Sequence, residues 1–288
     1  MNITHGLRRA LQVNPNGLAV VCGERRRNWR EVGTRVARLA SGIRALGAAN
    51  GDRVAILSLN SDRYLELYLA VGWAGAVIVP LNIRWSPIEN EDALRDCRAT
   101  ILFVDKAFAA VGATLADAIP GLTLIYADEG ETPEGMENYE TLITRSEPIP
   151  DAMRTRDDLA GIFYTGGTTG VAKGAMLTHR NLVANMLQVK ELMGANLDEG
   201  CEVLIAPLPL YHIYAFTFHC MAMMLIGGHN ILLTNPRDLP AVLKELSQHT
   251  FHSFPAVNTL FNALLHHPDF DQVNWRNLKV SVGGGMAV

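Results

Sequence analysis

The apolar residues of the chain fall into two repeating patterns. Short runs rich in Val, Ile and Leu predict buried strands, and they alternate with longer stretches in which apolar residues recur every three or four positions, as on a helix. The first two runs, at residues 18–22 and 27–29, predict a hairpin that turns at the Gly-Glu pair between them. An amphipathic helix follows at residues 32–46 and is stopped by a glycine.

The alternation continues through the sequence. Further strands are predicted at residues 53–57, 77–80, 101–104, 122–126, 159–164, 175–178, 203–206, 230–233, 253–254 and 278–282. Further helices are predicted at residues 61–75, 87–97, 139–144, 181–193, 211–226, 238–248 and 256–266, and a capping box of Ser86 and Glu89 starts the second of these. Strands separated by helices indicate an α/β fold with mainly parallel sheets and helices on both faces.

An acidic, proline-containing segment at residues 128–150 interrupts this alternation. Its composition predicts a surface connection that includes the short helix at 139–144. We therefore expect two α/β subdomains, at residues 1–150 and 151–288.

Composition narrows the class of protein. With 288 residues, of which 49% are hydrophobic and 19% charged, the chain can bury a large core, and its net charge of −4 does not indicate a nucleic-acid partner. Cysteines at positions 22, 97, 201 and 220 form no C-x-x-C pair, which predicts buried, reduced thiols in a cytoplasmic protein, and the nine histidines lack metal-ligand spacing. Neither the N-terminus nor the longest apolar run, residues 215–228, has the pattern of a signal peptide or membrane span.

The strongest candidate for chemistry is the run YTGGTTGVAKG at residues 164–174. Glycines let backbone amides turn around an anion, while threonine hydroxyls and Lys173 add donors and positive charge. The apolar runs on both sides favour phosphate binding over an ordinary surface turn, but the residues alone leave both open. The order differs from the Walker pattern G-x-x-x-x-G-K-S/T, since Gly174 follows the lysine.

The longer run YTGGTTGVAKGAMLTHRN resembles the signature loop of the acyl-adenylating superfamily, which contains acyl-CoA synthetases, nonribosomal peptide adenylation domains and luciferases. That loop follows S/T-S/G-G-S/T-T-G-x-P/A-K-G, and the chain has Gly166 where many members have Ser and Ala172 where most have Pro. The resemblance implies two stacked, mainly parallel sheets flanked by helices, as in the large N-terminal domain of the acyl-CoA synthetase fold. It implies a catalytic Lys173, a magnesium contact from Thr168, and an ATP phosphate site made of Tyr164, Thr165, Gly166, Gly167, Thr168, Thr169, Gly170 and Lys173.

The run PLPLYHIY at residues 207–214 resembles the PLFH motif of acyl-CoA synthetases. On the residues alone, its histidine is explained more readily as a core side chain. The resemblance implies that Tyr211 and a catalytic His212 lie near the substrate carboxylate, and that an acyl pocket is lined by Tyr211, His212, Tyr214, Ala215, Phe218 and, from the run FPAVNTL, Val257.

The run GGGMA after the last predicted strand resembles the adenine-contacting segment of the same family. Glycines let the backbone lie flat against a purine, although a turn after a strand also uses glycine. The resemblance implies that Gly283, Gly284, Gly285 and Met286 bind the nucleotide.

Residues 208–286 resemble in particular the bacterial long-chain fatty acid–CoA ligases. The implied reaction converts a fatty acid through an acyl-adenylate into its coenzyme A thioester, with ATP, Mg²⁺ and coenzyme A. Alternatives are a ligase for another carboxylate, such as an aryl acid, an acyl-AMP ligase that feeds a carrier protein, and a nucleotide-binding module without catalysis. The resemblance leaves a homodimer and peripheral membrane association open.

The sequence stops at Val288, shortly after the adenine-contacting segment. Later motifs of the family are not in it: the Y-G-x-T-E glutamate, the T-G-D aspartate, and the C-terminal lid with its catalytic lysine. We therefore expect a truncated N-terminal portion that is inactive, or nearly so, by itself.

Overall fold

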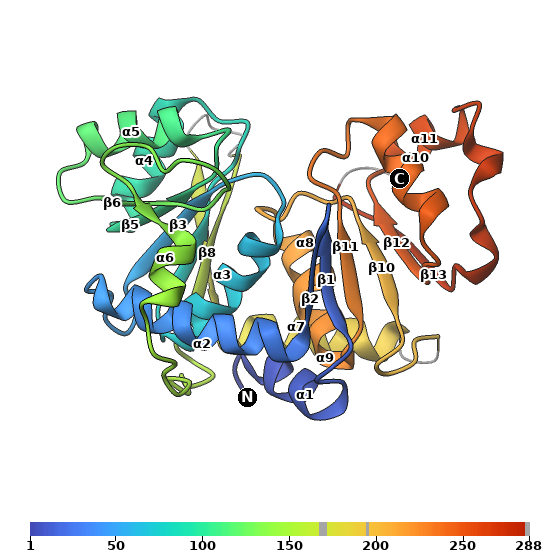
Figure 1. Cartoon of the computed structure of the whole chain (residues 1–288), viewed down its shortest axis with the longest axis horizontal. Helices are drawn as coiled ribbons and strands as arrows, with labels where there is room; N and C mark the ends of the chain where they lie inside the picture. Colours follow the sequence, from blue (N-terminus) through green and yellow to red (C-terminus); the bar gives the residue numbers. More distant parts are fainter. Residues whose placement is uncertain (167–171, 194–195, 286–288) are drawn as a thin grey trace. The chain divides into compact units, whose positions relative to one another are not determined.

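Two mainly parallel sheets organise the chain (Figure 1). The computed structural model describes residues 1–166, 172–193 and 196–285. These residues form two compact units, each built around one sheet. Unit 1 contains Met1–Thr4, Gly33–Leu59 and Arg63–Val183, and unit 2 contains His5–Val32, Asn60–Asp62 and Ala184–Val288.

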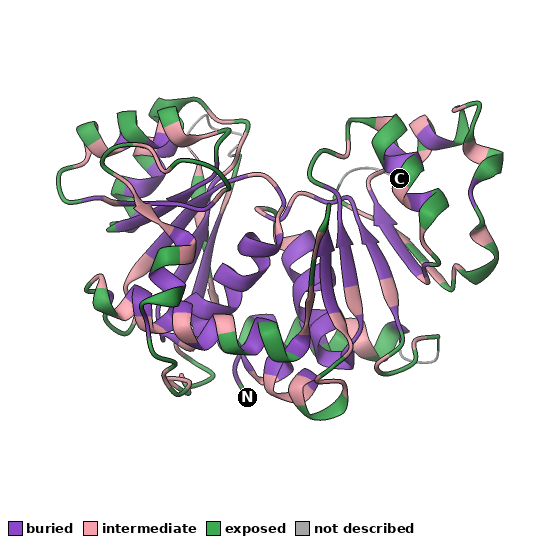
Figure 2. Ribbon diagram, viewed as in Figure 1, coloured by how far each residue is buried: buried purple, intermediate pink, exposed green. Residues whose placement is uncertain are grey.

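The sheet of unit 1 has seven strands in the order β7-β6-β5-β3-β4-β8-β9. All neighbours are parallel except β8 and β9, which form an antiparallel pair at one edge. The strands are β3 (Arg53–Leu57), β4 (Val77–Pro80), β5 (Ile101–Val104), β6 (Thr123–Tyr126), β7 (Glu137–Asn138), β8 (Leu159–Thr165) and β9 (Lys173–Thr178). The central strands are buried on both faces, as parallel strands covered by helices require (Figure 2).

Helices α4 and α5 pack their apolar side chains against β3, β4, β5 and β6. The predicted capping box is present on α4, where Ser86 accepts from the Glu89 backbone amide and the Glu89 carboxylate accepts from that of Ser86. The helices whose residues lie mainly in unit 1 are α2 (Trp29–Ala45), α3 (Asp62–Trp73), α4 (Pro87–Cys97), α5 (Ala109–Ala118) and α6 (Tyr139–Thr144).

The sheet of unit 2 has six strands in the order β13-β12-β10-β11-β1-β2, and only the β1–β2 hairpin is antiparallel. Helices α8 and α9 lie on one side of it, and α10 and α11 on the other (Figure 1). The strands are β1 (Leu18–Cys22), β2 (Arg25–Asn28), β10 (Val203–Ala206), β11 (His229–Leu232), β12 (Ser253–Ala256) and β13 (Val280–Gly283).

The helices of unit 2 include a seven-residue π-helix, Phe216–Ala222, all of it buried. The α-helices are α1 (His5–Val13), α8 (Ile213–Ala215), α9 (Met223–Ile226), α10 (Leu239–Gln248) and α11 (Asn258–Leu265), and α7 (His179–Met193) has residues in both units. Two short 3₁₀ helices, Phe270–Gln272 and Trp275–Asn277, precede β13. No helix in the described part of the chain has the length and apolarity needed to cross a membrane.

The division of the chain into these two units differs from the predicted division at residue 150. Strands β8 and β9 follow that boundary but extend the sheet of unit 1 through β4, while β1 and β2 precede it but join β11 in unit 2. The reason is that an apolar run predicts a strand without indicating its partner, so sheet membership depends on pairings far apart in sequence.

Several element predictions also need correction. The helix predicted at 211–226 is a short α-helix, the π-helix and α9 in succession, and the helix predicted at 256–266 starts at Asn258 because Pro255 and Ala256 pair with β13. Helix α1 was not predicted. Of the four cysteines, Cys201 is exposed, unlike the three buried ones.

Candidate nucleotide and acid-binding site

The two strands that carry the predicted phosphate loop form its base in unit 1. Thr165 at the end of β8 pairs with Lys173 at the start of β9, and both residues are exposed, as is Gly166. A lysine on this pair of strands is therefore accessible to an anion. The predicted loop residues Gly167, Thr168, Thr169 and Gly170 lie outside the described residues.

Tyr164 uses its hydroxyl to hold the loop base against α4. The hydroxyl contacts the Ala93 carbonyl oxygen at 3.1 Å and the Asp96 carboxylate, and the Trp85 ring packs edge-on at 6.2 Å between centroids. Burial, and then the bond to Asp96, raise the pKa of Tyr164, so it remains a phenol at neutral pH. Its predicted contact with nucleotide stays a prediction.

Gly174, opposite Tyr164, is needed for this packing. A Cβ atom at position 174 would lie 2.6 Å from Ile162 Cγ2, closer than real Cβ atoms approach, and 3.0 Å from Tyr164 Cζ, which is a tight contact. The glycine after Lys173 thus lets β9 pass beside the tyrosine ring.

The other predicted segments meet at the carboxyl edge of the unit 2 sheet. Residues 207–212 follow β10, Val257 follows β12, and Gly284 and Gly285 follow β13. Because these strands are parallel, their carboxyl ends lie at one edge of the sheet, where open α/β folds bind ligands.

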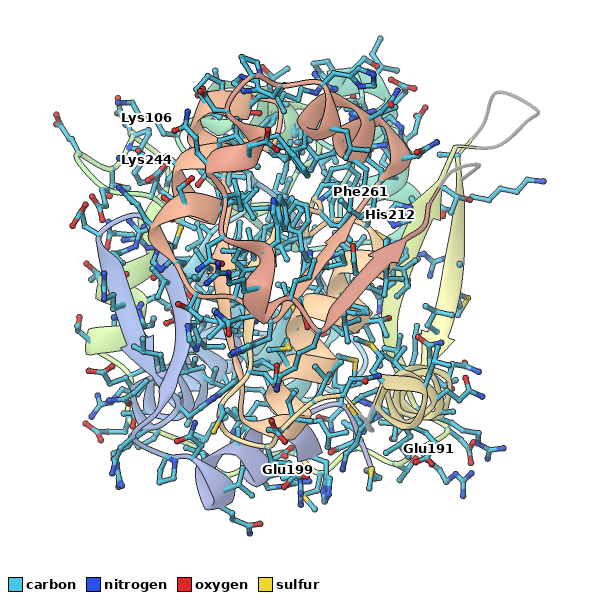
Figure 3. The ribbon with its side chains drawn as sticks, turned by 90° about the vertical axis from the view of Figure 1, so that its right-hand side faces the viewer. Lys106, Glu191, Glu199, His212, Lys244 and Phe261 are labelled. Carbon is cyan, nitrogen blue, oxygen red and sulfur yellow. The ribbon has the colours of Figure 1, made fainter. Side chains whose placement is uncertain are left out.

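His212 connects β10 to α8 and is an exposed residue at this edge (Figure 3). Its Nδ1 accepts a hydrogen bond from the Tyr214 amide at 3.2 Å and so caps the helix. Partial burial lowers the pKa of His212 below its ordinary value of 6.5. A neutral ring that accepts at Nδ1 carries its proton on Nε2, which leaves a donor for an oxygen atom of a ligand.

Tyr214 joins the predicted acid-binding segment to the predicted adenine-contacting segment. Its hydroxyl donates to the Val282 carbonyl oxygen at 3.0 Å, and a Cβ atom at Gly284 would lie 3.2 Å from its ring. The rings of Tyr214 and Phe218 meet edge to face at 6.1 Å. Burial raises the pKa of Tyr214 to about 12, so the hydroxyl remains a donor.

The remaining predicted residues lie around this contact. Ala215 and Phe218 are buried, and Tyr211 and Val257 are half-buried. Gly285 has a φ of +81°, and a Cβ there would lie 3.8 Å from Val257 Cγ1, so its backbone runs beside Val257. Met286 lies outside the described residues.

His219 is a polar residue of the π-helix and lies within the apolar run at residues 215–228. It is completely buried, and neither ring nitrogen has a hydrogen-bond partner among the described residues. Burial lowers the pKa of His219 to about 3. The ring is therefore neutral in the folded protein.

The described ranges contain no group of three His, Cys, Asp or Glu side chains that could hold a metal ion. The predicted magnesium contact, Thr168, lies outside those ranges. Magnesium bound to ATP phosphates needs only one or two protein ligands, so its involvement stays a prediction.

Comparison with known proteins identifies the family. The model of the AMP-binding enzyme family matches residues 7–288. The long-chain-fatty-acid–CoA ligase of Salmonella typhimurium is 38% identical over 269 residues, which cover 84% of this chain and 48% of the relative. A feruloyl-CoA synthase of Amycolatopsis sp. is 36% identical over 97% of this chain and 53% of its own length.

A solved structure leads to the same family. The anthranilate CoA ligase AuaEII in complex with anthranoyl-AMP superposes with a TM-score of 0.91 at 25% identity, over 100% of this chain and 55% of that protein. The chain spans about half the length of the curated relatives it matches. Its two mainly parallel sheets and its match across residues 7–288 show that the chain belongs to the AMP-binding enzyme family of adenylating ligases.

Proposed function

We propose that the chain supplies the nucleotide- and acid-binding part of an enzyme that uses ATP to join a long-chain fatty acid to coenzyme A. The observation that carries the proposal is the position of Tyr214, whose hydroxyl donates to Val282 and whose ring lies beside Gly284. An acyl-adenylate contains the acid and the adenosine in one molecule, so its two binding segments must be contiguous. Tyr214 provides that continuity.

The proposed reaction has two steps. A carboxylate oxygen of the acid bonds to the α-phosphorus of ATP, the bond to the β-phosphate oxygen breaks, and pyrophosphate leaves. The coenzyme A sulfur then attacks the acyl carbonyl carbon, its proton is released, and AMP departs. A carboxylate is already ionised at neutral pH, so the first step requires no general base.

The described residues contribute binding and charge. Lys173 is exposed at the base of the phosphate loop, where its charge would attract the ATP phosphates, and the Nε2–H of His212 would donate to an oxygen of the acid. Magnesium, when bound, would supply further neutralisation of the phosphates. The main barrier in the first step is bringing an anion to a polyanion, which alignment and fixed donors reduce.

The acid class is tested with stable adenylate analogues. Calorimetric titration of the chain compares dodecanoyl-sulfamoyladenosine, feruloyl-sulfamoyladenosine and unacylated sulfamoyladenosine. We expect the dodecanoyl analogue to bind at least about tenfold more tightly than the unacylated one, since an apolar site gains from burying the alkyl chain. Tightest binding of the feruloyl analogue would instead assign an aryl acid, in line with the similarity to a feruloyl-CoA synthase. Equal binding of all three would contradict an acid site.

A further inference from the structure

A buried asparagine ties together the loops at the carboxyl edge of the unit 2 sheet. Asn60 belongs to the short segment Asn60–Asp62, which lies in unit 2 although the chain on either side of it lies in unit 1. Its Nδ2 donates to the carbonyl oxygens of Leu208 at 2.9 Å and Leu233 at 3.0 Å, and its Oδ1 accepts from the Leu210 amide at 2.7 Å. One side chain thus binds two loops that are 148 and 173 residues away in sequence.

Two prolines limit the hydrogen bonds that the backbone of the bonded segment can donate. Pro207 and Pro209 have no amide hydrogen, so they cannot donate to a neighbouring strand or turn. Asn60 bonds to the residues on either side of Pro209, and Tyr211 and His212 follow directly. Its third bond, to Leu233, holds the residue that follows β11, the neighbour of β10 in the sheet.

The chemistry of the side chain suits this position. A primary amide donates two hydrogen bonds and accepts others at a fixed angle, which matches two carbonyl oxygens and one amide. Aspartate would retain only the acceptor, and alanine would leave three buried backbone groups without this partner. Such groups are costly when unsatisfied, so the loop would move to find others.

We propose that Asn60 is a positioning residue for acid binding. It holds Leu208 and Leu210 so that the following Tyr211 and His212 face the ligand at the carboxyl edge of the sheet. This inference rests on the proposed function, because it assigns the acid-binding role to the segment that Asn60 positions. It predicts that loss of Asn60 weakens binding of the acyl part of a ligand more than binding of its nucleotide part.

The test compares Asn60→Ala and Asn60→Asp with the unaltered chain, using dodecanoyl-sulfamoyladenosine and ATP as separate probes. We expect the Kd for the dodecanoyl analogue to rise about tenfold in both variants, while the Kd for ATP changes by less than about twofold. Asn90→Ala is the matched control, since Asn90 is also buried and its Nδ2 donates to the carbonyl oxygens of Trp85 and Ser86, but in unit 1. It should leave both constants unchanged.

The outcomes separate the two proposals. If the unaltered chain does not bind the dodecanoyl analogue, the proposed function is contradicted. If it binds, and the Asn60 variants bind equally well or lose affinity for both probes equally, the role of Asn60 is contradicted while the proposed function stands. Should the variants not fold, amide hydrogen exchange of the native chain decides: the Leu210 amide should be strongly protected, and exchange at the rate of an unprotected amide would overturn the inference.

Discussion

Replacing Arg35 with alanine is expected to lower the free energy of unfolding by about 3–5 kcal/mol, the usual cost of removing one partner from a buried ion pair. Arg35 Nε lies 2.7 Å from Oε1 of Glu66, whose side chain is completely buried. Its terminal nitrogens bond to both carboxylate oxygens of Glu140, at 2.8 and 3.0 Å. The arginine therefore joins α2 to α3 and α6 within unit 1.

The position of Glu66 explains why the effect should be large. Tyr139, also fully buried, donates its hydroxyl to Glu66 Oε2 at 2.9 Å. Burial, and then the Glu66 carboxylate, raise the pKa of Tyr139 well above its usual value, so it remains a neutral donor. Without Arg35, Glu66 would keep this bond but lose the adjacent cation, and a charged carboxylate is costly in a buried site.

Urea unfolding monitored by circular dichroism measures the loss. Arg38→Ala is the control on the same helix, because Arg38 donates to the Ser146 carbonyl oxygen at 2.8 Å and lies 3.9 Å from Glu147, which is 89% exposed. Its loss should cost no more than about 1 kcal/mol. Equal losses in the two variants would contradict the account of the buried ion pair.

Mild acid is expected to destabilise the chain strongly. Burial lowers the pKa of His179 and of His229 to about 4, and that of His219 to about 3, from an ordinary value of 6.5. Below 6.5 the unfolded chain therefore binds protons that the folded chain does not, so stability is lost as the pH falls toward 4. Each such histidine contributes about 1.4 kcal/mol per pH unit in this window, which is about 4 kcal/mol per pH unit for the three together.

The acid effect is measured by urea unfolding at several values between about pH 7 and about pH 5, where ordinary histidines titrate. Replacing His219 with phenylalanine keeps a large ring in the π-helix but removes one titrating group. The slope of unfolding free energy against pH should then fall by about 1.4 kcal/mol per pH unit. A free energy that does not change over this range would contradict the assignment of buried, neutral histidines.

Much of the secondary structure could be predicted from local pattern. Strands β5 and β10 and helix α6 have the bounds expected from the sequence, and β5 and β10 could be found because each is a short continuous apolar run, which predicts a buried strand. Helix α1 was missed because Gly6 lowers the helix propensity of this segment. The contacts that stabilise the helix are made with α9, far along the chain, and a local pattern does not reveal them. A Cβ at Gly6 would lie 2.7 Å from Met224 Cε, which shows how closely α1 packs on α9.

The segments of the candidate site could be proposed from the sequence, but the contacts between them could not. The motif residues around His212 and Gly284 could be found from their resemblance to a family, whereas the contact of Tyr214 with Val282 joins residues 68 positions apart. Asn60 gave no signal, since a lone asparagine after a strand is typical of a turn. Its role depends on backbone groups that only the folded sheet brings together.

Nucleotide binding by the phosphate loop is tested most directly by calorimetric titration of ATP with Mg²⁺ into the chain and into Lys173→Ala. Lys106→Ala is the control. Lys106 is also an exposed lysine, and it follows β5 in the unit 1 sheet, the sheet to which Lys173 belongs through β9 (Figure 3). We predict that the Kd for ATP rises about tenfold in Lys173→Ala, as expected for loss of one charged contact with phosphate, and is unchanged in Lys106→Ala. Equal affinity of Lys173→Ala and the unaltered chain, or no binding of ATP by the unaltered chain, would contradict the account.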